Sequence, residues 1–298
     1  MGEFLSSKFM ETLFGGLAFG VTYSLVALSL VIIWRSTHVL NFAQGAMAMI
    51  AAYIGLTQVD RHVNFWICVL ISLAAGFLIG GLTERVLVRP LYGKPEINPI
   101  VVMVGFLGLI EAGTTAIWGS QPRSIAAPFS QVYYSYHGRA ILLSPYVFFE
   151  IGVAVAIMIA ISMLFRFTNI GLKLRAAASA PEVARLLGVR VNRMLTLGWI
   201  LASGVGVMTA IVVETQGPTL TPTIMDPIFV SGFIAAAIGG LESPVGAVTG
   251  GITLGIITQF VLNYWSNNAS ILTPLVVLIV VLMIRPQGLF TRHADRRV

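Results

Sequence analysis

Charged side chains are scarce in this sequence, where Asp, Glu, Lys and Arg make up 10% of 298 residues. An ordinary soluble domain carries roughly 25%. A soluble globule needs a polar exterior, and so few charges cannot cover one. Because 57% of the residues are apolar, the sequence excludes a water-soluble fold and indicates a surface that mostly faces lipid.

Residues that carry chemistry are also scarce. One cysteine, Cys68, excludes an intrachain disulfide and a cysteine metal cluster. Only three lysines are present, and none stands in a phosphate-binding loop, where Gly-Lys is followed by Ser or Thr. No G-x-S-x-G or H-E-x-x-H motif occurs, and the four histidines are scattered. The sequence predicts no catalytic residue, metal or cofactor, and a membrane-embedded enzyme is the least supported class of function.

The net charge is nonetheless +6, with a pI near 9.8. In a soluble protein this excess would suggest nucleic-acid binding. In a membrane protein it indicates basic cytoplasmic loops. We therefore expect membrane lipid, and no nucleic acid, as a partner.

Long apolar runs divide the chain into membrane-spanning windows. They are Thr12 to Trp34, Val39 to Thr57, Val63 to Thr83, Pro99 to Trp118, Pro145 to Phe165, Met194 to Val213, Pro227 to Leu241, Val245 to Trp265 and Ile271 to Ile284. The window at 227–241 is too short for a plain span and could be re-entrant or broken. We predict one all-α polytopic domain over residues 1–298, with about eight transmembrane helices.

The basic residues cluster in three segments, 84–98, 166–193 and the C-terminal tail from Arg285. The windows allow all three to lie on one side of the membrane, which the positive-inside rule makes the cytoplasm. Segments 119–144 and 216–226 would then lie outside.

Segment 166–193 is the most distinctive of the three. Ala176 to Leu187 favours a helix, with Ser179 as a cap ahead of Pro181 and Gly188 as its stop. Arginines Arg175, Arg185 and Arg190 surround an apolar face that includes Ala184 and Leu187. Such a helix fits either an anionic lipid surface or a cytoplasmic partner, and the residues alone do not separate the two.

A few polar residues interrupt the apolar windows. Glu111 lies mid-window, where a carboxylate is costly unless it faces a cavity or a partner. It could line a path or hydrogen-bond a neighbouring helix. Glu150 and Glu214 lie nearer the window ends, where we expect water to reach them. Asn41 and Gln44 fit either a helix break beside a path or interhelical hydrogen bonding.

Glycines recur at helical spacing, as in Gly16-xxx-Gly20 and Gly251-xxx-Gly255, which permits close helix packing. GGLAFGV at 15–21 resembles GGITLGI at 250–256. This similarity is compatible with an internal repeat but too short to establish one.

Ordered motifs along nearly the whole chain resemble the LivH-type permease subunits of branched-chain amino acid ABC importers. The matching stretches are GGLAFGVTYSLVALSLVIIW, NFAQGAMAMIAAY, IGLKLRAAASAPEVARLLGV, IGGLESPVGAVTGGITLG and RPQGLF. The family often has His where this chain has Gln44, which weakens any role for histidine protonation in its cycle.

The resemblance implies a multi-pass permease of a bacterial or archaeal plasma membrane. Its partners would be a second related permease, two cytoplasmic ATPases and an extracytoplasmic substrate-binding protein. The ATPases would drive alternating access through a coupling helix at about 176–188. The residues expected there are Ala177, Glu182, Ala184, Leu187 and Gly188, with Arg175, Arg185 and Arg190 as flanking docking charges.

We place Asn41, Gln44 and Glu111 on the translocation path as a hypothesis. The substrate could be a branched-chain amino acid, urea, a short amide, an aromatic carboxylate or another small solute. An alternative function is an ion-coupled secondary transporter or channel that works without ATPases and uses Glu111.

Overall fold

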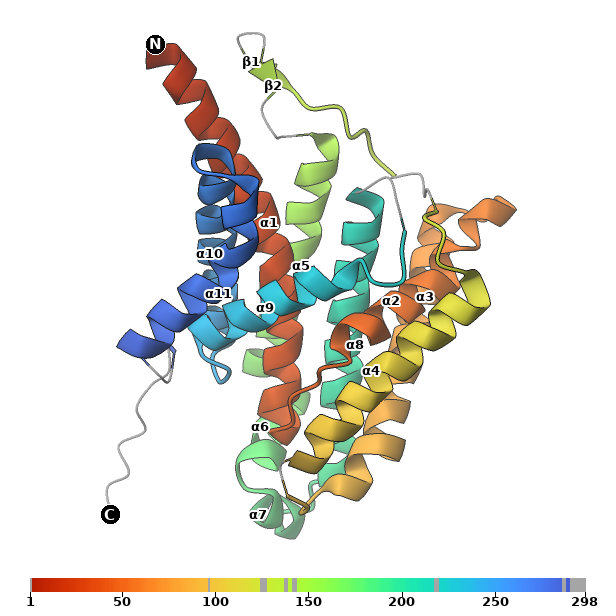
Figure 1. The fold of residues 1–298 in the computed structure, drawn as a ribbon. Coiled ribbons are helices and arrows are strands. Elements are labelled where there is room, and N and C mark those ends of the chain that lie inside the picture. Colours follow the sequence, from red (N-terminus) through yellow and green to blue (C-terminus); the bar gives the residue numbers. More distant parts are fainter. Residues whose placement is uncertain are drawn as a thin grey trace.

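The computed structural model describes residues 2–95, 97–123, 128–136, 139–140, 144–216, 220–285 and 288–289. It confirms the predicted all-α polytopic fold (Figure 1). The elements are α1 (Gly2–Thr37), α2 (Gln44–Leu56), the short helix η1 (Val59–Arg61), α3 (Phe65–Leu82), the π-helix η2 (Thr83–Val88), η3 (Arg89–Leu91), α4 (Ile97–Trp118), β1 (Ser135–Tyr136), β2 (Arg139–Ala140), α5 (Pro145–Phe167), α6 (Asn169–Ser179), α7 (Pro181–Leu186), α8 (Val191–Gln216), α9 (Met225–Gly239), α10 (Pro244–Tyr264) and α11 (Asn267–Ile284).

Seven helical segments of the described chain are long and apolar enough to cross a membrane. They are Lys8–Thr37, Phe65–Leu91, Ile97–Trp118, Pro145–Phe167, Val191–Thr215, Pro244–Tyr264 and Asn267–Ile284. The last is longer than its apolar window because Ser266 caps it, accepting a hydrogen bond at 3.1 Å from the backbone N of Ala269.

Two further apolar helices, α2 and α9, are short. With 13 and 15 residues they reach only about 20 and 22 Å, against a hydrocarbon core of roughly 30 Å. Helix α9 occupies the window predicted to be re-entrant or broken. Helix α2 differs from the full span predicted at Val39 to Thr57, because its helix begins only at Gln44.

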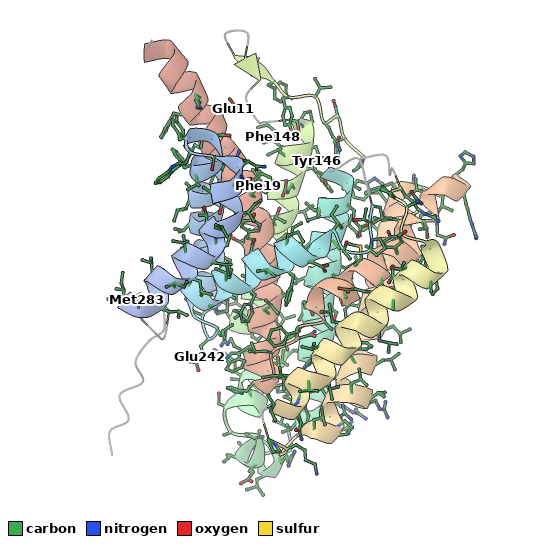
Figure 2. All side chains as sticks on the ribbon, viewed as in Figure 1. Glu11, Phe19, Tyr146, Phe148, Glu242 and Met283 are labelled. Carbon is green, nitrogen blue, oxygen red and sulfur yellow. The ribbon has the colours of Figure 1, made fainter. Side chains whose placement is uncertain are left out.

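Helices α1 and α8 form the centre of the molecule. In their membrane-spanning windows 83% and 72% of the residues are buried, against 17% in both α4 and α11. Side chains of the outer helices therefore point away from the protein, as Phe148 and Met283 do in Figure 2. This apolar exterior is what the low charge of the sequence predicts for a lipid-facing surface.

The helices form two halves with matching neighbours. In the first, α2 packs on α3 and α8, and α4 packs on α2; in the second, α9 packs on α10 and α1, and α11 packs on α9. Helix α8 runs antiparallel to α1 (Figure 1). The halves α1–α4 and α8–α11 thus have the arrangement of an inverted repeat.

The similar glycine segments of α1 and α10 do not occupy corresponding positions in these halves. They pack against each other instead: a Cβ at Gly16 would lie 2.7 Å from Cα of Ile256, and one at Gly20 would lie 2.7 Å from Cα of Ile252. The similarity is therefore a helix-packing motif, and the correspondence between the halves comes from other elements.

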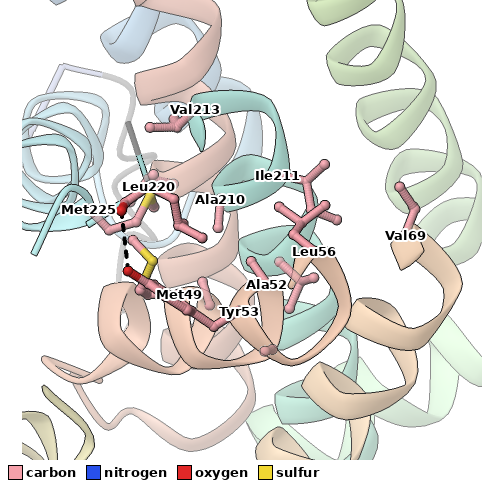
Figure 3. Packing of buried hydrophobic residues seen from close by; sticks show 14 of the residues in the cluster. Met49, Ala52, Tyr53, Leu56, Val69, Ala210, Ile211, Val213, Leu220 and Met225 are labelled. Atoms are coloured by element: carbon pink, nitrogen blue, oxygen red, sulfur yellow. Dashed lines mark hydrogen bonds between the residues drawn. The ribbon is translucent and has the colours of Figure 1, made fainter. Parts of the chain in front are cut away.

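The short helix α2 is held in one of the main apolar clusters (Figure 3). Met49, Tyr53 and Leu56 pack against Ile211 of α8 and against Met225, where α9 begins. The Tyr53 hydroxyl donates to the carbonyl of Leu220 at 3.4 Å. These contacts fix α2 between α3, α8 and the start of α9.

The ends of the molecule differ in charge. Figure 1 shows α6, α7 and the beginning of α4 at one end, with the N-terminus and the β1–β2 hairpin at the other. The basic segments 84–98 and 166–193 therefore share an end. Of the third basic segment, Arg292, Arg296 and Arg297 lie outside the described residues.

Candidate functional site

The segment expected to couple to a partner consists of two helices rather than one. Thr168 caps α6, accepting a hydrogen bond at 3.0 Å from the backbone N of Gly171. The chain then breaks at Ala180, whose backbone is outside the helical region (φ −147°, ψ 74°), and α7 begins at Pro181. Ser179 therefore ends α6 and does not cap α7, which differs from the prediction. Gly188 terminates the segment as predicted, with φ +80°.

The predicted apolar face is divided between two sides of this segment. Ala177 and Ala184 are 2% exposed and pack together with Val191 of α8. Leu187 is 78% exposed and points away from the protein. Ala177 and Ala184 therefore attach the segment to α8, and Leu187 remains for a partner.

Two further exposed apolar residues of this surface were not predicted from the sequence. Leu186 is 88% exposed and Val183 is 55% exposed. We define the α7 tip as Val183, Leu186 and Leu187. Their i, i+3, i+4 spacing is the sequence pattern that indicates three residues on one face of a helix.

The charged residues of the segment have different surroundings. Glu182 is exposed beside the α7 tip. Arg185 and Arg190 line a cleft of about 430 Å³ together with Arg89 and Arg193. Arg175 lies apart from them, in a second cavity with Arg35. The three predicted docking arginines are therefore not one cluster.

A buried ion pair fixes the neighbouring end of α3. Glu84 is fully buried in the π-helix η2 and accepts hydrogen bonds from Arg89 at 2.7 Å, Thr196 at 2.7 Å and Tyr92 at 3.1 Å. Burial, together with the adjacent Glu84 carboxylate, raises the pKa of the Tyr92 phenol. Since Thr196 belongs to α8, this network joins α3 to the helix that carries the coupling segment. The sequence places Glu84 and Arg89 in a basic loop, because the apolar window before them ends at Thr83. Their spacing of five is also not the three or four residues of an α-helical pair.

Asn41 and Gln44 lie together at the start of α2, and both are almost fully buried. The Asn41 amide donates to Oε1 of Gln44 at 3.0 Å, and its Oδ1 accepts from the backbone N of Ala43 at 3.0 Å. Gln44 Nε2 donates to the carbonyl of Ala202 on α8 at 3.0 Å. Asn41 thus pairs one backbone N–H just before α2, and Gln44 joins the start of this helix to α8.

Glu111 is not part of this amide pair. It lies half-buried on α4, with its carboxyl group near that of Asp226 in the first turn of α9. The neighbouring Ile110 packs against Ala43 and Met47 at the start of α2. The three predicted path residues therefore border the beginnings of both short helices without forming one cluster.

The expectation that water reaches Glu150 and Glu214 is wrong, because both side chains are fully buried. Glu150 accepts a hydrogen bond from the Thr22 hydroxyl of α1. Neither carboxylate oxygen of Glu214 has a hydrogen-bond partner among the described residues. Both residues lie near the end of an apolar window, and that position alone does not show that neighbouring helices cover their side chains.

Comparison with known proteins identifies the class of molecule that this architecture represents. A family profile described as branched-chain amino acid transport system / permease component matches residues 12–284. The chain belongs to this family of membrane permeases.

Curated relatives match over most of their length. The permease protein BraD of Pseudomonas aeruginosa, from a high-affinity branched-chain amino acid transport system, is 24% identical over 97% of this chain and 98% of its own. A probable branched-chain amino acid transport permease, LivH of Methanocaldococcus jannaschii, is 27% identical over 92% and 90%. The fructose import permease FruF of Bifidobacterium longum is 24% identical over 84% and 69%.

Proposed function

We propose that the chain is the transmembrane permease subunit of an ABC importer for branched-chain amino acids or a related small organic solute. The permease family and the amino acid permeases among its relatives support the substrate class. The observation that carries the mechanism is the α7 tip, three exposed apolar residues at the basic end of the molecule.

On this proposal the molecule works with a second related permease, two cytoplasmic ATPases and an extracytoplasmic binding protein, in the plasma membrane of a bacterium or archaeon. Its own role is transport and not catalysis. Energy has to come from the partners, because the three lysines of the sequence lie outside any phosphate-binding loop.

The coupling segment would transmit movement as follows. Leu187 would enter a groove on the ATPase, with Glu182, Arg185 and Arg190 selecting its orientation by charge. Ala177 and Ala184 would pass the displacement to α8 through their contact with Val191. Because α8 packs on α1, α2 and α3, its displacement would reach the centre of the bundle and shift it between outward and inward states.

Asn41, Gln44 and Glu111 would border the translocation path. The support is their position where α2 and α9 begin, since broken backbone inside a membrane is tolerated where protein or a watery cavity covers it. Their contacts also fit a structural role, and transport kinetics of Gln44→Ala and Glu111→Gln would distinguish the two.

The docking proposal is tested by reconstituting the permease with its ATPases and binding protein in proteoliposomes. Leu187→Asp and Glu182→Lys should lower uptake at least about tenfold, because each places an unfavourable charge in the contact. The permease should still insert and melt normally, since both positions are exposed. Lys94→Glu, an exposed charge change in the turn before α4, is the matched control. Unchanged uptake in both α7 variants would overturn the docking assignment.

The proximity of the Glu111 and Asp226 carboxyl groups favours one alternative, an ion-coupled transporter without ATPases. Paired carboxyls in a membrane protein are suited to carry a proton or cation. The purified chain alone, in liposomes under an ion gradient, would then take up solute, and Glu111→Gln would abolish the uptake. Strict dependence on added ATPase and ATP would reject this alternative.

A further inference from the structure

A cavity of about 350 Å³ opens at the end of α1 opposite the N-terminus. Three parts of the chain that are distant in sequence enclose it: the end of α1, the last turn of α5 with the second half of α6, and the turn between α9 and α10. Its lining residues are Trp34, Arg35, Ser36, His38, Phe165, Leu174, Arg175, Ala178, Ser179 and Glu242. Figure 2 labels Glu242 in that turn.

Two guanidinium groups face this cavity. Arg35 of α1 is half-buried, with its guanidinium 5.6 Å from the centre of the Phe165 ring. Arg175 of α6 lies near enough to repel it. Among the described residues the one salt bridge is that of Glu84 with Arg89, so neither arginine is in a salt bridge there. Two like charges beside one cavity favour an anionic group between them.

A charge of opposite sign lies across the same cavity. The Glu242 carboxylate is near enough to attract Arg35 without forming a salt bridge with it. It is exposed and can therefore accept a cationic group from a ligand. The cavity thus offers two positive groups and one negative group.

The remaining walls combine polar and apolar side chains. Phe165, Leu174 and Ala178 are apolar, Ser36 and Ser179 are polar, and Trp34 lies against His38 with ring centres 5.5 Å apart. A cavity near the lower limit for small-molecule sites, with charged groups of both signs beside apolar side chains, suits a solute of amino-acid size.

We propose that this cavity is an inner binding station for a zwitterionic aliphatic amino acid, an inference that rests on the proposed function. The carboxylate binds between Arg35 and Arg175, the ammonium group faces Glu242, and the aliphatic side chain packs against Phe165 and Leu174. Since Leu174, Arg175 and Ala178 belong to α6, movement of the coupling segment changes the shape of the station.

The test measures equilibrium binding to the purified full chain in phosphatidylcholine nanodiscs. Three probes differ in charge: L-leucine carries both groups, 4-methylpentanoate only the carboxylate, and 3-methylbutylamine only the ammonium group. Leucine should bind tightest, because it alone satisfies both ends of the cavity.

Two variants should affect the probes in opposite ways. Arg175→Gln should weaken leucine and 4-methylpentanoate about tenfold each and leave 3-methylbutylamine unchanged or tighter. Glu242→Gln should weaken leucine and 3-methylbutylamine but leave 4-methylpentanoate unchanged or tighter. Lys173→Gln, an exposed charge on the same helix outside the cavity, should change nothing. Matching melting temperatures would establish that the variants fold.

Three outcomes overturn the proposal: no saturable binding of any probe up to about 10 mM, equal effects of both variants on all probes, or displacement of leucine by phosphatidylglycerol in the nanodisc. The last would assign the arginine pair to a lipid phosphate. A failure of the proposed function is distinguishable, because ATPase-dependent uptake by the full complex would then be absent even if the cavity binds leucine.

Discussion

The guanidinium of Arg89 holds the buried carboxylate of Glu84 through two hydrogen bonds, 3.2 Å from Nε to Oε1 and 2.7 Å to Oε2. The same guanidinium donates to Thr196 of α8 at 2.7 Å. The end of α3 and the beginning of α8 are therefore joined by hydrogen bonds from this ion pair to Thr196 as well as by packing.

Removing Arg89 should destabilise the protein. Arg89→Met leaves the Glu84 carboxylate buried without its cation, which we expect to cost about 2 kcal/mol. This is less than the ~3–5 kcal/mol of a fully buried pair, because the Arg89 side chain is 30% exposed. Thermal unfolding in detergent measures the loss. Arg85→Met, at an exposed neighbour, is the control, and adding Glu84→Gln to Arg89→Met should recover part of the stability. No recovery in the double variant would contradict a charge effect.

Because α1 and α10 are in close contact, a larger residue at Gly255 should strongly destabilise the protein. A Cβ there would collide with the backbone N and Cα of Gly20, so Gly255→Ala must separate the helices and lose their packing. The variant should melt well below wild type. Gly108→Ala on α4, where a new Cβ meets nothing within 4 Å, should melt as wild type. Equal melting of the two variants would refute the contact.

Gly188 should resist replacement for a different reason. A Cβ there meets nothing within 4 Å, but φ is +80°, so Gly188→Ala costs about 1 kcal/mol of backbone strain. We expect reduced ATPase-coupled uptake, with recovery in Gly188→Asn because Asn tolerates this conformation better. Gly152→Ala, in the helix α5, should be neutral or stabilising. A Gly188→Asn variant as impaired as Gly188→Ala would point to a need for space and not for backbone freedom.

Replacing the buried residues Glu150 and Glu214 by leucine should change the stability of the protein in different ways. Glu150→Leu removes the acceptor of the Thr22 hydroxyl and should destabilise the protein by about 1–3 kcal/mol. Glu214→Leu removes a buried polar group whose oxygens lack hydrogen-bond partners among the described residues, and should be neutral or stabilising. Thermal unfolding of both variants checks the sign, and a large loss in Glu214→Leu would show an interaction that the described contacts omit.

Composition and apolar windows were sufficient to predict the fold class, because low charge and long apolar runs depend little on tertiary detail. They were insufficient for α2. Val39 and Leu40 are apolar, yet the helix begins only at Gln44, after Asn41 has accepted a hydrogen bond from the backbone N of Ala43. Hydropathy does not report such a side-chain interaction.

The candidate site was predicted more coarsely. Pro181 and Gly188 were interpreted correctly, since both act through local backbone geometry. The opposite orientations of Ala184 and Leu187 depend on α8 lying behind α7. The burial of Glu150 likewise depends on α1. Neither the orientations of Ala184 and Leu187 nor this burial could therefore be predicted from the local sequence.

Helices α2 and α9 are too short to span the bilayer, and this constrains how the protein inserts into the membrane. A segment of 13 or 15 helical residues exposes unpaired backbone groups to hydrocarbon if it enters a bilayer alone. The seven long segments can each insert independently. Biogenesis must therefore have an order, in which the long helices insert first and the two short helices enter only once α1 and α8 are present to receive them.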